Sequence, residues 1–158
     1  MPERGDTLMQ LRFVCGMTLR EFALNSAEYA QALHLREAVL RKPLGLTLTA
    51  QELADEPSYF HLGGFHGEQL VAVLLLRPLD AQTVKMRQVA VHPEAQMRGL
   101  GSQLVAFAER FAKERGFKKI VAHARESAVA FYCKIGYSTV GEDFLETTIS
   151  HRLVIKEL

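Results

Sequence analysis

The stretch VAVHPEAQMRGLGSQLVAFAERFAKERGF, residues 89–117, decides the fold of this chain. It begins with the alternation of a strand, passes through a turn that contains Gly99 and Gly101, and continues as an amphipathic segment. Apolar residues recur in that segment at helical spacing: Leu100, Leu104, Phe107 and Phe111. A strand, a glycine-containing turn and a helix N-terminus together can bind an anion, because the first amides of a helix lack partners and glycine admits a ligand close to the backbone.

The turn differs from the best-known phosphate loops. The pattern Gln96-x-x-Gly99-x-Gly101 lacks the Lys-Ser/Thr ending of a Walker loop and the three glycines of the dinucleotide fingerprint. Arg98 adds a side chain that can make a charge-assisted contact with an anion. From these residues alone, a phosphate cradle and a flexible helix start are both open.

The segments around this stretch predict one α/β domain with a mixed sheet. Residues 1–16 show no clear period and are interpreted as an arm or an edge strand, and residues 17–158 as the domain. Strands alternate or stay apolar between turn residues, and helices show caps and a longer period. Strands are expected within 17–24, 58–67, 68–79, 83–92, 118–124, 137–144 and 149–158, and helices within 25–42, 48–57, 100–115 and 127–135.

Composition excludes several classes of function. Hydrophobic residues make up 48% and charged residues 23% of 158 residues, as in a soluble globular protein. The net charge of +1 gives no basic excess for nucleic acid or an anionic membrane. No apolar run spans a bilayer, and the N-terminus has no apolar signal segment. Cys15 and Cys133 lack metal-like spacing, so a reducing cytoplasm is the expected location.

Two motifs in order make the chain resemble the GNAT superfamily of N-acetyltransferases. Residues 89–117 are similar to the strand, loop and helix of that family, with its signature Q/R-x-x-G-x-G/A. HARESAVAFYCKIGYSTVGEDF, residues 123–144, is similar to the second family segment, A-x-x-F-Y-x-K-x-G-F/Y. The resemblance extends more weakly to residues 35–45 and 67–76. It implies a single-domain GNAT fold, a mixed and mostly antiparallel sheet flanked by helices, with splayed parallel central strands ending near Val91 and Ala124.

The resemblance also implies acetyl-CoA as the acetyl donor. The pantetheine arm is expected to bond the strand backbone around Val89 and Val91, and the pyrophosphate to lie on the amides of Met97 to Ser102. At the start of the second helix, Ser127 or Arg125 is expected to approach CoA, where the family often has asparagine. The residues expected to bind the donor are Val89, Val91, Gln96, Met97, Arg98, Gly99, Leu100, Gly101, Ser102 and Ser127.

Acetyl transfer to an amine needs a neutral amine, a donor for the oxyanion and a stabilised thiolate. The resemblance points to Tyr132, which matches the tyrosine of the F-Y pair, for the thiolate; a buried aromatic on an amphipathic helix is the structural alternative. An ordinary tyrosine has a pKa of about 10 and a thiol one of about 8.5. Full proton transfer is therefore uphill, and donation of a hydrogen bond is enough.

The base is sought in FLETTISH, residues 144–151, which is similar to the tail F-x-E-x-G-I-P-H of one branch of the family. Glu146 and His151 match that tail, whereas Thr148 and Ser150 replace its glycine and proline. An imidazole suits a base at neutral pH. Glu146 and His151 are therefore catalytic candidates. A structural histidine, a carboxylate elsewhere and a water chain stay open as alternatives.

Other candidates receive the plainer interpretation. His61 and His66 are five residues apart, which puts them on opposite faces of a strand, so no metal is expected. Arg36 and Arg41 can reach toward an acidic substrate or the CoA phosphates, but a solvated helix face is favoured.

The predicted activity is acetyl transfer from acetyl-CoA to the primary amine of a small molecule, by direct attack in a ternary complex. The alternatives are a non-catalytic acyl-CoA sensor and an acyltransferase that uses another acyl donor or a peptidyl amine. Dimerisation through the last strands is common in the family and is possible here.

Overall fold

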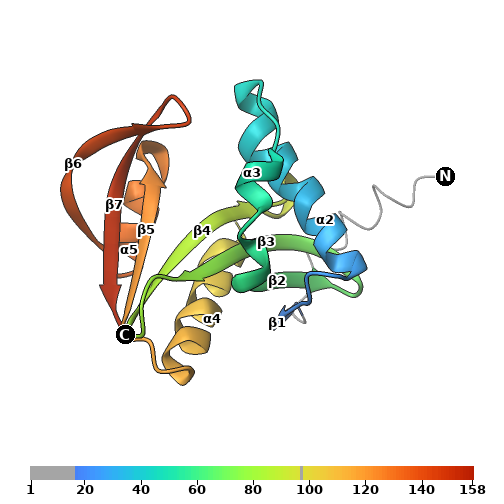
Figure 1. Ribbon diagram of the computed structural model, residues 1–158, viewed down its shortest axis with the longest axis horizontal. Helices are drawn as coiled ribbons and strands as arrows, with labels where there is room; N and C mark the ends of the chain where they lie inside the picture. The colour runs from blue at the N-terminus through green and yellow to red at the C-terminus, as the bar shows by residue number, and fades with distance from the viewer. Residues whose placement is uncertain (1–16, 97) are drawn as a thin grey trace. The chain divides into compact units, whose positions relative to one another are not determined.

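A computed structural model describes residues 17–96 and 98–158 (Figure 1). The interpretation of residues 1–16 as an arm, and the role expected of Met97, lie outside the described residues. The strands are β1 (Thr18–Glu21), β2 (Phe60–His66), β3 (Gln69–Pro78), β4 (Thr83–Val91), β5 (Lys119–Arg125), β6 (Ser138–Glu146) and β7 (Ile149–Glu157). The α-helices are α2 (Ala27–Arg36), α3 (Ala50–Leu53), α4 (Leu100–Glu114) and α5 (Val129–Lys134).

The strands form a mixed sheet in the order β1-β2-β3-β4-β5-β7-β6. β4 and β5 are parallel, with Thr83 to Met86 paired to Lys119 to Ala122, and they are joined through α4 as a parallel pair requires. The pairs β1–β2, β5–β7 and β6–β7 are antiparallel. The α/β fold, the order of the elements and the parallel pair expected from the sequence are confirmed.

Contacts divide the described chain into two compact units. The N-terminal unit comprises the described residues up to Leu75 together with Gln88–Phe107, and the C-terminal unit comprises Leu76–Arg87 and Ala108–Leu158. The boundaries fall inside β3, β4 and α4, so these three elements contribute to both units.

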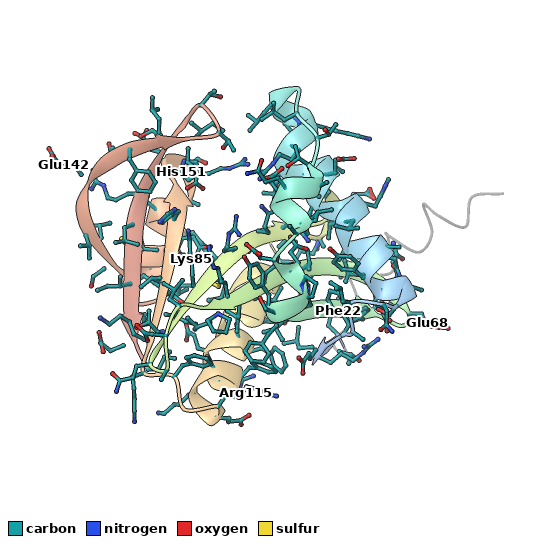
Figure 2. The ribbon with its side chains drawn as sticks, in the orientation of Figure 1. Phe22, Glu68, Lys85, Arg115, Glu142 and His151 are labelled. Atoms are coloured by element: carbon teal, nitrogen blue, oxygen red, sulfur yellow. The ribbon has the colours of Figure 1, made fainter. Side chains whose placement is uncertain are left out.

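In the C-terminal unit the two faces of the sheet differ in what covers them. Lys156 of β7 reaches Glu109 of α4 and the carbonyl oxygen of Ile135 after α5, so its face carries the helices. The register pairs Val121 with Lys85 and Leu153 with His123, and paired residues share a face. Because residues alternate along a strand, these side chains lie on the face opposite Lys156. We call this the His123 face. Its side chains include Lys85, His123, Phe144, Glu146 and His151, of which Lys85 and His151 are labelled in Figure 2.

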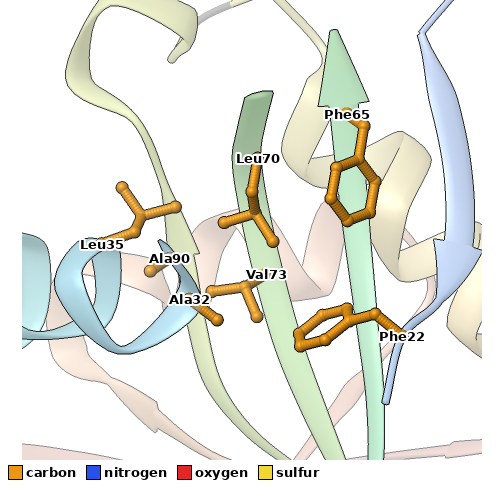
Figure 3. Packing of buried hydrophobic residues seen from close by; sticks show 7 residues of the cluster. All are labelled: Phe22, Ala32, Leu35, Phe65, Leu70, Val73 and Ala90. Carbon is orange, nitrogen blue, oxygen red and sulfur yellow. The ribbon is translucent and has the colours of Figure 1, made fainter. Parts of the chain in front are cut away.

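The core of the N-terminal unit lies between α2 and β2–β4 (Figure 3). Its buried side chains are Phe22, Ala32, Leu35, Phe65, Leu70, Val73 and Ala90. A methyl group added at Gly63 would meet Phe65 and Leu70 on this face, whereas one at Gly64 would approach Leu100 of α4. Helices α2 and α4 therefore pack on opposite faces of this part of the sheet.

Local signals in the sequence set the starts of α2 and α3. Ser26 caps α2 by accepting a hydrogen bond from the backbone N–H of Tyr29 at 3.3 Å. Thr49 and Glu52 form a reciprocal capping box at α3. The chain continues from α2 as a π-helical turn, Glu37–Arg41, rather than as a longer α-helix.

Candidate active site

The turn between β4 and α4 closes on itself through local hydrogen bonds. The Gln96 side-chain amide donates to the carbonyl oxygen of Val91 at 2.9 Å. The Ser102 hydroxyl donates to the carbonyl oxygen of Gly99 at 3.0 Å. These bonds fold the chain from the end of β4 into the first turn of α4. Arg98 remains exposed beside that turn.

Among the described residues, the backbone amides at the start of α4 have no hydrogen-bond partner, as an anion site requires. Within residues 98–158, the first helical hydrogen bond of α4 runs from the N–H of Gln103 to the carbonyl oxygen of Gly99, so the amides of Leu100, Gly101 and Ser102 precede it. α4 has 15 residues, enough for its dipole to favour negative charge at this end. These groups fit a diphosphate, which could accept from several amides at once.

Gly99 and Gly101 contribute in different ways. Gly99 has φ +77°, and a Cβ added there would meet no atom within 4 Å. The left-handed backbone, rather than crowding, therefore demands glycine at this position. A bulky residue at Gly99 would therefore strain the backbone. Gly101 lies in the first turn of α4, where the backbone is helical.

The other residues expected to bind the donor lie at the ends of strands. Val89 and Val91 are the half-buried final residues of β4 in the N-terminal unit. Ser127 is exposed in the 3₁₀ turn Glu126–Ala128, which leads into α5 of the C-terminal unit.

Tyr132 lies on α5 and is 6% exposed. Its ring contacts those of Phe131 and Tyr137 at centroid distances of 5.1 and 5.3 Å. Burial raises the pKa of Tyr132 to about 12. The hydroxyl therefore stays protonated at neutral pH and can only donate or accept a hydrogen bond there.

On the His123 face, Glu146 of β6 meets a histidine that the sequence analysis did not single out. Nδ1 of His123 lies 2.8 Å from Oε1 of Glu146. The pairing of β5 with β7 and of β7 with β6 brings these two residues together. The alternation of His123 with Ala122 and Ala124 indicated that its side chain lies on the face opposite these buried alanines, but its partner could not be predicted from the local sequence.

His151 is 4% exposed on β7, and its Nδ1 lies 2.8 Å from the carbonyl oxygen of Ile149. A carbonyl oxygen only accepts, so the proton is assigned to Nδ1 and the lone pair of the neutral ring lies on Nε2. Phe144 stacks on His151 at 6.0 Å and meets His123 edge-on at 4.9 Å. The structure thus brings Glu146 and His151 to one face, with an aromatic ring between the two imidazoles.

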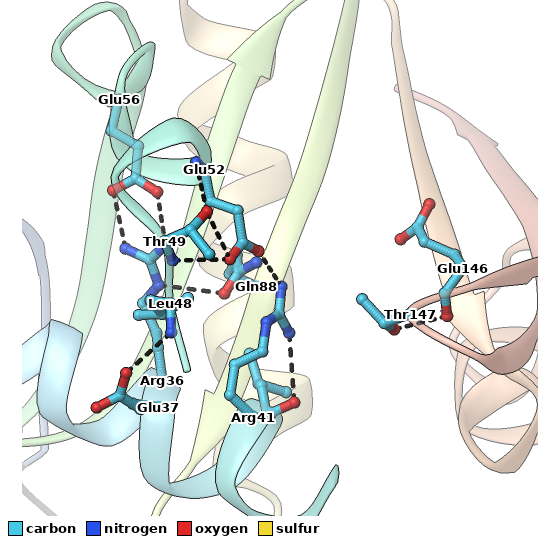
Figure 4. Close-up of polar contacts among 11 residues, drawn as sticks. Arg36, Glu37, Arg41, Leu48, Thr49, Glu52, Glu56, Gln88, Glu146 and Thr147 are labelled. Carbon is cyan, nitrogen blue, oxygen red and sulfur yellow. Dashed lines mark hydrogen bonds and ion pairs between the residues drawn. The ribbon is translucent and has the colours of Figure 1, made fainter. Parts of the chain in front are cut away.

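The hairpin turn after Glu146 has an unusual backbone. Thr147 and Thr148 have φ values of 50° and 63°, which β-branched residues rarely adopt. Such a two-residue turn usually carries Asn-Gly. The Thr147 hydroxyl donates to the carbonyl oxygen of Glu146 at 2.6 Å (Figure 4). The turn therefore keeps the hairpin geometry without the glycine found in the similar family tail.

Electrostatics on the His123 face hold Glu146 ionised. Burial alone would raise the pKa of Glu146, but the hydrogen bond from His123 and the charges of His123, His151 and Lys85 outweigh it and lower that pKa. The pKa of half-buried Lys85 is lowered, first by burial and then by the charge of Arg87; Glu146 opposes this and Arg77 adds to it.

The sequence favoured a solvated helix face for Arg36 and Arg41. The structure shows instead that both residues are buried. Arg36 is fully buried and forms a bidentate ion pair with Glu56, which also accepts from the Tyr29 hydroxyl at 2.8 Å. Nε of Arg36 donates to the side chain of Gln88 at 3.3 Å. Arg41, 7% exposed, pairs with Glu52 at 2.6 Å (Figure 4). Both guanidiniums are thus occupied within the N-terminal unit.

His61 is buried, and its Nε2 lies 2.9 Å from the carbonyl oxygen of Glu56. Its Nδ1 is buried without a hydrogen-bond partner in the described chain. Burial lowers the pKa of His61. Within residues 17–96 and 98–158, no group of three or more His, Cys, Asp or Glu side chains could hold a metal ion. No helix in the same ranges is long and apolar enough to cross a membrane.

A family model described as the acetyltransferase (GNAT) family matches residues 24–137. The uncharacterized protein YyaT of Bacillus subtilis is 30% identical over 98 residues, which cover 62% of this chain and 66% of that protein. The chain therefore spans just under two thirds of the length of this curated relative.

Solved structures share the fold. A candidate N-acetyltransferase of Lactobacillus plantarum has a TM-score of 0.82 at 23% identity, covering 90% of this chain and 99% of that one. A GNAT family acetyltransferase of Elizabethkingia anophelis with acetyl-CoA bound has a TM-score of 0.72 at 18% identity, covering 92% and 100%. N-acetylglutamate synthase of Neisseria gonorrhoeae, complexed with coenzyme A and N-acetyl-glutamate, has a TM-score of 0.73 at 19% identity, covering 92% and 36%.

Proposed function

The chain belongs to the GNAT acetyltransferase family, and we propose that it transfers an acetyl group from acetyl-CoA to the primary amine of a small molecule. The observation that carries this proposal is the start of α4, where amides without a partner among the described residues and Gly101 offer a backbone cradle beside exposed Arg98. Two structures of the same fold, cited above, hold acetyl-CoA or coenzyme A.

The donor is bound by the backbone in this proposal. The amides of Leu100 to Ser102 donate hydrogen bonds to the pyrophosphate oxygens, with Arg98 adding charge. Val89 and Val91 offer strand backbone to the pantetheine arm, Gln96 holds the turn through the Val91 carbonyl group, and Ser127 approaches the donor from the start of α5. When bound, acetyl-CoA supplies a thioester carbonyl group for attack by the amine.

His151 takes the proton of the amine. Its Nδ1 is committed to the Ile149 carbonyl oxygen, which leaves the Nε2 lone pair as the acceptor. Glu146 stays ionised and stabilises the positive charge that develops nearby. As the new N–C bond forms and the C–S bond breaks, the proton passes from the amine to His151.

Tyr132 stabilises the leaving thiolate by donating a hydrogen bond. Its pKa of about 12 lies above that of a thiol, near ~8.5, so transfer of the proton itself is uphill. The hydroxyl keeps its proton through the reaction, and the thiolate is protonated by solvent after release.

A CoA-release assay against a panel of primary amines tests the proposal. Turnover with acetyl-CoA and a small amine is the expected result. Binding of acetyl-CoA without turnover would instead indicate an acyl-CoA sensor, and faster turnover with longer acyl chains or a peptide amine would indicate a different donor or acceptor.

The His151→Gln variant tests the base, with the exposed His34→Gln as the matched control. We expect the acid limb of the pH–rate profile to change in His151→Gln and to persist in the control. An unchanged profile in His151→Gln would exclude this histidine as the base.

A further inference from the structure

The His123 face offers two opposite charges to a ligand. Glu146 is a carboxylate with a side chain 47% exposed, fixed on one oxygen by His123 at 2.8 Å. Lys85 lies on the neighbouring part of the same face, opposite Val121, which is two residues before His123 on β5. Phe144 and His151 complete the surface between β5 and the β6–β7 hairpin.

Lys85 lacks a direct anionic partner. No hydrogen bond or ion pair joins its ammonium group to another residue in the described ranges, although its side chain is half-buried. The charged groups that act on it are two guanidiniums, Arg77 and Arg87, and one carboxylate, Glu146. Burying an ammonium group among other cations is costly unless an anion approaches it.

Glu146 is shared among several cations. His123 bonds one of its oxygens, and His151 and Lys85 act on it through their charges. His123, His151 and Lys85 therefore share this one carboxylate, although together they could bind more than one anion. A ligand that brought its own anionic group to Lys85 would leave Glu146 available for a cation.

We propose that the acceptor is a primary amine that also carries a carboxylate or phosphate group, and that the His123 face binds it, with Glu146 receiving the ammonium group and Lys85 the anionic group. This inference rests on the proposed acetyltransferase function. It adds the charge of the acceptor, which neither the family nor its fold specifies.

The binding mode suits the chemistry of the site. An amine bound as its ammonium ion beside Glu146 lies on the same face as His151. The ammonium group first loses one proton to solvent, and His151 takes the second as the neutral amine forms the N–C bond. The ion pair with Lys85 fixes the far end of the acceptor, and holding both ends orients the amine for attack. A diamine would place a second cation against Lys85, and a neutral amine would leave Lys85 without a partner.

The experiment compares matched acceptors with the full chain and acetyl-CoA. Each ω-amino acid is paired with its carboxamide, and each aminoalkyl phosphate with its amino alcohol, so that the two sources of negative charge are separated. We expect kcat/KM to be roughly 10- to 100-fold higher for the anionic member of at least one pair. Diamines of the same length should be the poorest acceptors.

The Lys85→Met variant removes the charge and keeps the stem of the side chain. It should lower kcat/KM for the preferred anionic acceptor about as much as removal of the anion does, while leaving the neutral partner nearly unchanged. Lys118→Met removes an exposed lysine elsewhere in the C-terminal unit and is the matched control. The binding of acetyl-CoA, measured by calorimetry, should stay the same in both variants.

The outcomes separate the inference from the proposed function. If no amine releases CoA, the proposed function itself fails. If the wild-type enzyme turns over neutral amines or diamines as well as anionic ones, or if Lys85→Met slows both members of a pair equally, the acetyltransferase stands and the anionic acceptor is wrong.

Discussion

The buried ion pair between Arg36 and Glu56 should dominate the stability of the N-terminal unit. The two side chains are 0% and 2% exposed, and the guanidinium group contacts both carboxylate oxygens. Glu56→Gln keeps the size of the side chain but leaves the Arg36 charge buried without a counter-ion. Breaking a buried pair in this way costs about 3–5 kcal/mol. For a chain of this length, Tm should fall by roughly 6–20 °C.

Thermal and urea unfolding followed by circular dichroism measure this loss. Glu52→Gln is the matched control, because Glu52 also pairs with an arginine but its side chain is 27% exposed, so its removal should cost at most about 1 kcal/mol. The double variant Arg36→Met, Glu56→Leu should recover most of the loss, since no charge remains buried. Equal losses for Glu56→Gln and Glu52→Gln, or a double variant less stable than Glu56→Gln, would refute the reasoning.

Three further predictions address the donor loop, the thiolate donor and a buried histidine. Gly101→Ala should keep or raise Tm, because alanine favours a helix by up to about 1 kcal/mol. Calorimetry should show acetyl-CoA binding weakened by roughly tenfold or more. Unchanged affinity would contradict the binding of the donor at the start of α4. Tyr132→Phe should lower kcat about 10- to 150-fold with little change in acetyl-CoA affinity, because the variant loses a hydrogen bond to a charged group. A wild-type kcat in this variant would mean that Tyr132 serves only in packing. Burial holds the pKa of His61 below the ordinary histidine value of about 6.5, so as the pH falls the unfolded chain takes up a proton at that position before the folded chain does. Stability should therefore fall as pH drops below 6.5, by up to about 1.4 kcal/mol per unit; His61→Gln should show a shallower fall in urea midpoints, and exposed His34→Gln the wild-type slope.

Much of the fold could be predicted because its signals are local. The apolar spacing that starts at Leu100 is sufficient for α4, and Ser26 and Thr49 cap α2 and α3 wherever these helices pack. The turn between β4 and α4, which is expected to bind the donor, could be predicted for the same reason, because the turn, the glycines and the helix start are contiguous. These features depend on the backbone and its near neighbours, so a single sequence contains them.

The charged and titratable groups could be predicted only in part. Arg36 was expected on a solvated face because periodicity shows where a helix is amphipathic but not where a partner such as Glu56 will fold against it. His123 was missed because its partner, Glu146, lies two strands away in the sheet, β7 being between them.

The amino-acid sequence by itself determined the family, the order of the elements and the loop expected to bind the donor, because each of these depends on residues that are contiguous in the chain. The tertiary structure alone decided which ionisable groups share a face. The register of β5 with β7 and of β7 with β6 puts His123, Glu146 and His151 together, and the parallel pairing of β4 with β5 adds Lys85. Electrostatic interactions depend on distance through space and on burial, and neither quantity follows from spacing along the chain.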